Sequence, residues 1–159
     1  MKFLLSQNRF VILLTILIFF LSIGYILDLV ITHFYPEPVE EVSSSYLILK
    51  FGFGVLFAPL VETLICQHWL IPFTVKKLPF NSHNKKWLWA IIISSIFFGL
   101  GHTYNPVYVI GTMILGLIFG ATYWLFTLRK DIHPAMAVFI IHFINNFLAF
   151  VTNDLRTWH

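Results

Sequence analysis

Three ionisable side chains lie within long apolar stretches of this sequence: Glu62, His102 and His142. A carboxylate and two imidazoles that converge in a water-poor interior form a hydrolytic set. The carboxylate can take a proton from water, and ring N–H groups can donate to a developing oxyanion. Asn146 lies four residues after His142, so it shares a helix face with that residue and adds an amide donor.

The same residues allow two other interpretations. They can form a buried polar network that only holds helices together. Glu62, His102 and His142 can also bind zinc, because three protein ligands and a water are the usual catalytic arrangement of that metal. The close-spaced pair, however, is His-x-x-x-Asn, which is a poor metal pattern. We therefore expect no cofactor, with zinc as the minor alternative.

The composition places these side chains in a membrane. Of the 159 residues, 58% are hydrophobic and only 11% are charged, and the mean hydropathy is +0.84. Ordinary globular domains are about a quarter charged. The sequence thus predicts a single integral membrane domain over residues 1–159. The few basic residues do not form a patch with exposed aromatics, so nucleic acid is not an expected partner.

The elements that must position the polar residues are membrane-spanning helices. About 20 apolar residues in a helix cross the hydrocarbon core. The apolar runs are continuous rather than alternating, which favours helices over strands. The sequence therefore predicts an all-α, polytopic transmembrane bundle of about five spans, of which the third is short: residues 10–31, 46–71, 87–101, 107–128 and 134–151.

Charges in the connections predict the orientation. Lys and Arg mark the cytoplasmic side of a membrane protein. Lys2 and Arg9 precede the first span, four lysines lie in residues 76–86, and Arg129 and Lys130 follow the fourth span. We expect a cytoplasmic N-terminus, an external C-terminus and a bacterial plasma membrane, with the lysines against anionic lipid. The first span can alternatively be read as a signal peptide.

Counting along the predicted spans gives each polar residue a depth from the cytoplasmic end. At the rise of an α-helix, Glu62 lies at about 14 Å and His142 at about 12 Å. His102 lies deeper, at about 21 Å. Two of the three groups therefore match in depth, and the third requires a tilted helix or a shifted helix start.

Three short motifs, one on each of three predicted spans, resemble those of a known family. The segment ETLICQ begins with Glu62, FGLGH joins Phe98 to His102, and HFINN joins His142 to Asn146. In this order they resemble the CPBP family, also called the ABI family, of CAAX proteases and bacteriocin-processing proteins. These are glutamate intramembrane endopeptidases, and the resemblance covers about residues 50–150, the catalytic core of the family.

The resemblance implies the role of each residue. Glu62 is the general base that activates water, His102 assists or orients that water, and His142 and Asn146 stabilise the oxyanion. Phe98, Thr63 and Gln67 would support the site. The expected partners are the lipid bilayer and a peptide or membrane-protein substrate.

The first motif departs from the family pattern Glu-Glu-x-x-x-Arg. Thr63 replaces the second glutamate, and Gln67 replaces the arginine. The alternative function is therefore a catalytically inactive family member that acts as a membrane immunity or regulatory partner.

Overall fold

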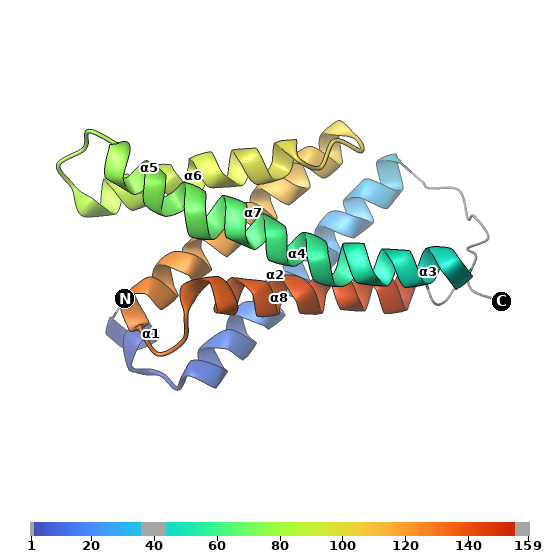
Figure 1. Ribbon diagram of the computed structural model, residues 1–159, viewed down its shortest axis with the longest axis horizontal. Helices are drawn as coiled ribbons and strands as arrows, with labels where there is room; N and C mark the ends of the chain where they lie inside the picture. The colour runs from blue at the N-terminus through green and yellow to red at the C-terminus, as the bar shows by residue number, and fades with distance from the viewer. Residues whose placement is uncertain (1, 36–43, 155–159) are drawn as a thin grey trace.

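The protein is a bundle of helices joined by short connections. The computed structural model describes residues 2–35 and 44–154, and in these ranges every regular element is helical (Figure 1). The predicted all-α polytopic bundle is confirmed. One long helix, residues 44–77, corresponds to the second predicted span and is called the second helix below. The other elements are α1 Lys2–Ser6, α2 Arg9–Phe34, α6 His83–Leu100, α7 Pro106–Arg129, α8 Pro134–Ala149 and η3 Phe150–Asp154.

The second helix is continuous from residue 44 to residue 77 but alternates between α and π geometry. Its segments are α3 Ser44–Lys50, η1 Phe51–Phe57, α4 Ala58–Glu62, η2 Thr63–Leu70 and α5 Ile71–Lys77. Pro59 and Pro72 each follow a π-helical segment by two residues. A proline lacks an N–H and its ring clashes with the carbonyl one turn earlier. The wider π turn relieves this conflict, so the chain stays helical through both prolines.

Four helices are long and apolar enough to cross a membrane, counted over the described residues: Arg9–Phe34, Tyr46–Lys77, Pro106–Arg129 and Pro134–Thr152. They correspond to four of the five predicted spans. The third predicted span is a helix, α6, but its first turn is the polar run His-Asn-Lys-Lys. The apolar remainder is about 21 Å long, which is shorter than the hydrocarbon core. The chain is an integral membrane protein in which α6 packs most closely against α7.

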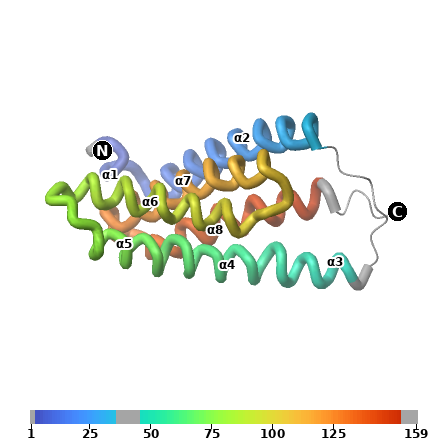
Figure 2. The backbone as a smooth tube through the Cα atoms, turned by 90° about the horizontal axis from the view of Figure 1, so that it is seen from above, coloured from blue at the N-terminus to red at the C-terminus, as the bar shows by residue number. Residues whose placement is uncertain are grey.

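Basic residues gather at one end of the bundle. The start of α2, the turn between α5 and α6 and the turn between α7 and α8 all lie at this end, whereas α3 and the end of α2 lie at the other (Figures 1 and 2). The residues at the basic end include Arg9, Lys76, Lys77, Lys85, Lys86, Arg129 and Lys130. The charges of the connections predict this arrangement, in which the basic residues lie at one end of the bundle. The position of the site can then be described relative to the two ends.

Glycines allow α6 and α7 to approach closely. A Cβ built on Gly99 would lie 2.8 Å from the carbonyl oxygen of Val109, and one on Gly116 would lie 3.0 Å from the Cα of Ser95. A Cβ on Gly120 would meet Ile91 at 2.7 Å. Gly116 and Gly120 form the G-x-x-x-G spacing that brings membrane helices together. These contacts fix the height and rotation of α6 against α7.

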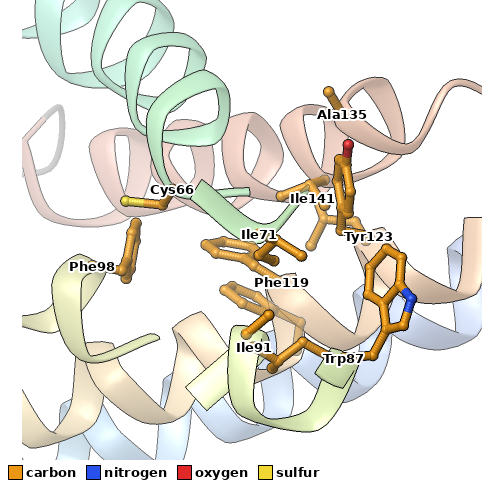
Figure 3. Packing of buried hydrophobic residues seen from close by; sticks show 12 residues of the cluster. Cys66, Ile71, Trp87, Ile91, Phe98, Phe119, Tyr123, Ala135 and Ile141 are labelled. Carbon is orange, nitrogen blue, oxygen red and sulfur yellow. The ribbon is translucent and has the colours of Figure 1, made fainter. Parts of the chain in front are cut away.

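The main apolar core lies where the second helix, α6, α7 and α8 meet. Figure 3 shows side chains from all four, among them Ile71, Phe98, Phe119 and Ile141. Phe20 of α2 joins this core by stacking on Phe119 with ring centroids 4.6 Å apart. The core holds these helices in register, and the functional site lies beside it.

A buried arginine joins the end of α7 to the segment before α2 at the basic end of the bundle. Arg129, the last residue of α7, donates to the backbone carbonyls of Leu4 and Gln7 before α2 begins. It also donates to the Asp131 carboxylate at 2.6 Å. This hydrogen bond holds the pKa of Asp131 below its ordinary value. A lowered carboxylate pKa stabilises the folded state above the unfolded-state pKa, and the stabilisation is lost as the pH falls through the folded-state pKa.

We therefore expect Asp131→Asn to lower the free energy of unfolding at pH 7 by about 0.5 kcal/mol, since the carboxylate is partly exposed. The difference between the two proteins should begin to shrink as the pH falls below about 4, the ordinary pKa of an aspartate in the unfolded chain, and it should vanish below the lowered pKa of the folded state. Thermal denaturation in detergent across a pH series measures both. A deficit of the same size at every pH would contradict this origin in the carboxylate charge.

Candidate active site

Glu62 is the last residue of α4, at the point where the helix widens into η2. Its carboxylate oxygen Oε2 lies 3.6 Å from Nε2 of His142 and 3.8 Å from Nε2 of His102. Its side chain is 31% exposed. These separations are longer than direct hydrogen bonds, as is common in unliganded catalytic sites. One carboxylate thus lies between two imidazoles that come from different helices.

His102 lies two residues beyond the end of α6. Its backbone N–H donates to the Gly99 carbonyl at 2.9 Å, and its ring nitrogen Nδ1 lies 2.7 Å from the Phe98 carbonyl oxygen. A carbonyl oxygen can only accept, so Nδ1 must carry the proton. In the neutral ring, Nε2 is then an acceptor. His102 therefore presents a lone pair toward Glu62, and its ring rests against Phe98 at 4.7 Å.

His142 lies in the middle of α8 and is almost fully buried, with a side chain that is 5% exposed. Its ring packs against Phe119 at 4.7 Å and meets Phe98 edge to face at 5.6 Å. The two aromatic rings hold the imidazole so that Nε2 faces Glu62. Nδ1 is buried and has no hydrogen-bond partner.

Asn146 lies one turn further along α8. Its amide Nδ2 donates to the Gly54 carbonyl of η1 at 2.9 Å, and its Oδ1 accepts from Asn145 at 3.2 Å. The Gly54 contact occupies one of the two amide hydrogens of Asn146, because an asparagine carries two. Asn146 therefore ties α8 to the second helix and keeps one N–H to offer to another acceptor.

Of the three predicted supporting residues, Phe98 contacts both histidines, as described above. Thr63 and Gln67 are buried inside η2, at 1% and 0% exposure. Neither the Thr63 hydroxyl nor the Gln67 amide has a hydrogen-bond partner. The two side chains that depart from the family motif are therefore buried polar groups in the helical segment that follows Glu62.

The contacts, rather than counting along the helices, resolve the depth mismatch: the Glu62 carboxylate lies within 3.8 Å of both His102 and His142. The second helix runs on to Lys77, so Glu62 lies about 22 Å from its basic end rather than 14 Å. The helix α6 begins at His83, so the same count places His102 about 28 Å from the start of its helix. The helix α8 begins further inside the bundle than α6 does, so equal counts along the two helices do not mean equal depth (Figures 1 and 2). The predicted end at Ile71 was wrong, because Pro72 does not stop the helix.

Two contacts of the site were missed by sequence reasoning. Phe119 packs on the His142 ring, and the Gly54 carbonyl accepts from Asn146. Both belong to helices whose local spacing gave no such signal. As for metals, the described residues contain no group of three or more His, Cys, Asp or Glu side chains arranged to hold an ion.

Fold and site together define a class: a polytopic helical membrane protein with a Glu–His–His cluster between its helices. In a comparison with protein families, the chain matches the model described as Type II CAAX prenyl endopeptidase Rce1-like over residues 44–148. Because the match covers about two thirds of the chain, this protein belongs to that family of intramembrane endopeptidases. Searches of curated proteins and of solved structures found no match.

Proposed function

We propose that the protein is an intramembrane endopeptidase in which Glu62 activates the attacking water. The observation that supports this most strongly is the position of the Glu62 carboxylate, within 3.8 Å of the Nε2 atoms of both His102 and His142. The side chains of Glu62 and His102 are partly exposed, whereas that of His142 is buried. The accessible side of the cluster is thus the side where water can meet a substrate carbonyl.

The protonation of His102 suggests how the water is oriented. Its Nε2 and the Glu62 carboxylate are both acceptors, and a water molecule has one hydrogen for each of them. As the water oxygen attacks the peptide carbonyl carbon, Glu62 takes one proton. The carbonyl oxygen becomes an oxyanion, to which Nε2–H of His142 and the free amide N–H of Asn146 donate. Glu62 then returns its proton to the leaving amine as the C–N bond breaks. No metal takes part in this proposal.

The substrate proposed is a peptide or membrane protein within the bilayer. The basic end of the bundle would face the cytoplasm, with its lysines against anionic lipid. The second candidate is an inactive partner protein, and the observation that favours it is the departure of Thr63 and Gln67 from the family motif.

A comparison of membrane-derived peptides separates the two functions. Cells with the wild-type protein and cells with Glu62→Gln should be analysed by quantitative mass spectrometry of the membrane fraction. For a protease, specific peptides should disappear in the variant while their uncut precursors accumulate. Identical peptide profiles at equal protein levels would favour the non-catalytic partner.

A further inference from the structure

Three buried side chains next to the site carry polar atoms without partners. They are the Thr63 hydroxyl, both polar atoms of the Gln67 amide, and Nδ1 of His142. Each of these side chains is at most 5% exposed. An unpaired buried polar group costs about 1–3 kcal/mol, so such groups in native proteins are nearly always paired with protein or with internal water.

These atoms belong to one region of the bundle. Thr63 and Gln67 are four residues apart and lie on one face of η2, and η2 packs directly against α8. Thr63 follows Glu62, whose carboxylate lies 3.6 Å from the His142 ring. Helical side chains tilt toward the N-terminus of their helix. The long Gln67 side chain therefore extends back toward the turn that holds Thr63 and Glu62.

The segment that carries Gln67 has π geometry. In a π-helix the backbone pairs residues five apart, and Gln67 is five residues after Glu62 in the helix that contains η2. Gln67 therefore lies about one turn after Glu62 along the helix. In the same region, Cys66 faces Phe98 of α6 (Figure 3).

Whether Nδ1 of His142 donates or accepts a hydrogen bond depends on which ring nitrogen carries the proton. Nε2 faces the Glu62 carboxylate, which only accepts hydrogen bonds, so in the neutral ring the proton belongs on Nε2. Nδ1 is then an acceptor that needs a donor. Gln67 and Thr63 both carry donors, and one internal water has the usual number of partners, about three, when it binds all three groups.

We propose that Gln67 and Thr63 are positioning residues for His142, which hold a water that donates to Nδ1 and thereby keep the proton on Nε2. This inference rests on the proposed function, because the proton on Nε2 is what the oxyanion would receive. In this proposal Thr63 and Gln67, which depart from the family motif, act as uncharged hydrogen-bond donors.

The first test is ¹⁵N NMR of the histidine-labelled protein in detergent micelles, with the His142 signals assigned by a His142→Gln variant. Wild type should show a protonated Nε2 and an unprotonated Nδ1. Gln67→Met and Thr63→Val remove the donors with little change of volume, and each should shift the tautomer toward Nδ1–H. Thr63→Ser keeps the hydroxyl and should keep the wild-type tautomer.

The second test uses the kinetics of cleavage. Gln67→Met should lower kcat by about tenfold to a hundredfold, the scale of a weakened oxyanion donor, while KM changes less than about twofold. Thr74→Val is the matched control, because Thr74 is buried on the same helix but about 10 Å further along it, and it should leave kcat unchanged.

Several results would overturn the inference. A wild-type spectrum with the proton on Nδ1, or on both nitrogens, would do so even if Gln67→Met did not fold. So would an unchanged tautomer in folded Gln67→Met and Thr63→Val. The NMR result does not depend on cleavage. A normal tautomer response in a protein without Glu62-dependent cleavage would therefore refute the proposed function alone.

Discussion

Replacing Glu62 with glutamine is expected to lower the rate of peptide cleavage by about 10³-fold or more, within the range for loss of a general base. Glutamine has nearly the same shape as glutamate but cannot take a proton from water. Its amide can still meet His102 and His142, so the fold should persist. The measurement is cleavage of a substrate peptide by purified protein in detergent, with thermal denaturation of both proteins to confirm the fold.

Two controls sharpen this experiment. Thr74→Val changes a buried polar residue on the same helix away from the site and should keep the wild-type rate. Protein that has been treated with a chelator and shown by elemental analysis to be free of metal should also keep it, because the proposed water is activated by a carboxylate. Loss of activity on chelation with recovery on adding zinc would instead assign Glu62, His102 and His142 as metal ligands.

The sequence was sufficient to predict the helices because a membrane span needs a long apolar run, and such runs are visible without any tertiary information. It also predicted that Glu62, His102 and His142 converge, since each is a polar group that an apolar environment would otherwise penalise. The structure brings the carboxylate of Glu62 to both rings. The catalytic roles of these residues and of Asn146 stay predictions.

Other features depended on contacts that no local pattern encodes. Pro72 indicates a helix end by its covalent geometry, yet the π turn before it lets the helix continue to Lys77. The tautomer of His102 depends on the Phe98 carbonyl, which accepts from Gly101 and lies within reach of the His102 ring because α6 ends there. The burial of Gln67 and Thr63 follows from the packing of η2 against α6, α7 and α8.

The residue that links this packing to the site is Gly99. Its carbonyl accepts the backbone N–H of His102 at 2.9 Å. On its other side, a Cβ would lie 2.3 Å from the Met113 Cγ and 2.8 Å from the Val109 carbonyl oxygen. The Met113 side chain can rotate away, but the Val109 carbonyl belongs to the α7 backbone. An added methyl group must therefore push α6 and α7 apart at the turn that carries His102.

Gly99→Ala is accordingly expected to lower the free energy of unfolding by about 1–3 kcal/mol, the usual cost of an overpacked core. Cleavage should also fall by about tenfold to a hundredfold, since a displacement of about 1 Å at a catalytic group has an effect of this size. Denaturation in detergent and the cleavage assay measure the two effects separately.

Gly52→Ala is the matched control for Gly99→Ala. Gly52 is also helical, in η1, and a Cβ built on it meets no atom within 4 Å. The same chemical change there should leave activity unaltered and leave stability unchanged or raised, because alanine favours the helix by about 1 kcal/mol over glycine. Equal behaviour of the two variants would mean that close packing of α6 on α7 does not position His102. A loss confined to Gly99→Ala would connect the spacing of two membrane helices to the placement of an imidazole at the end of one of them.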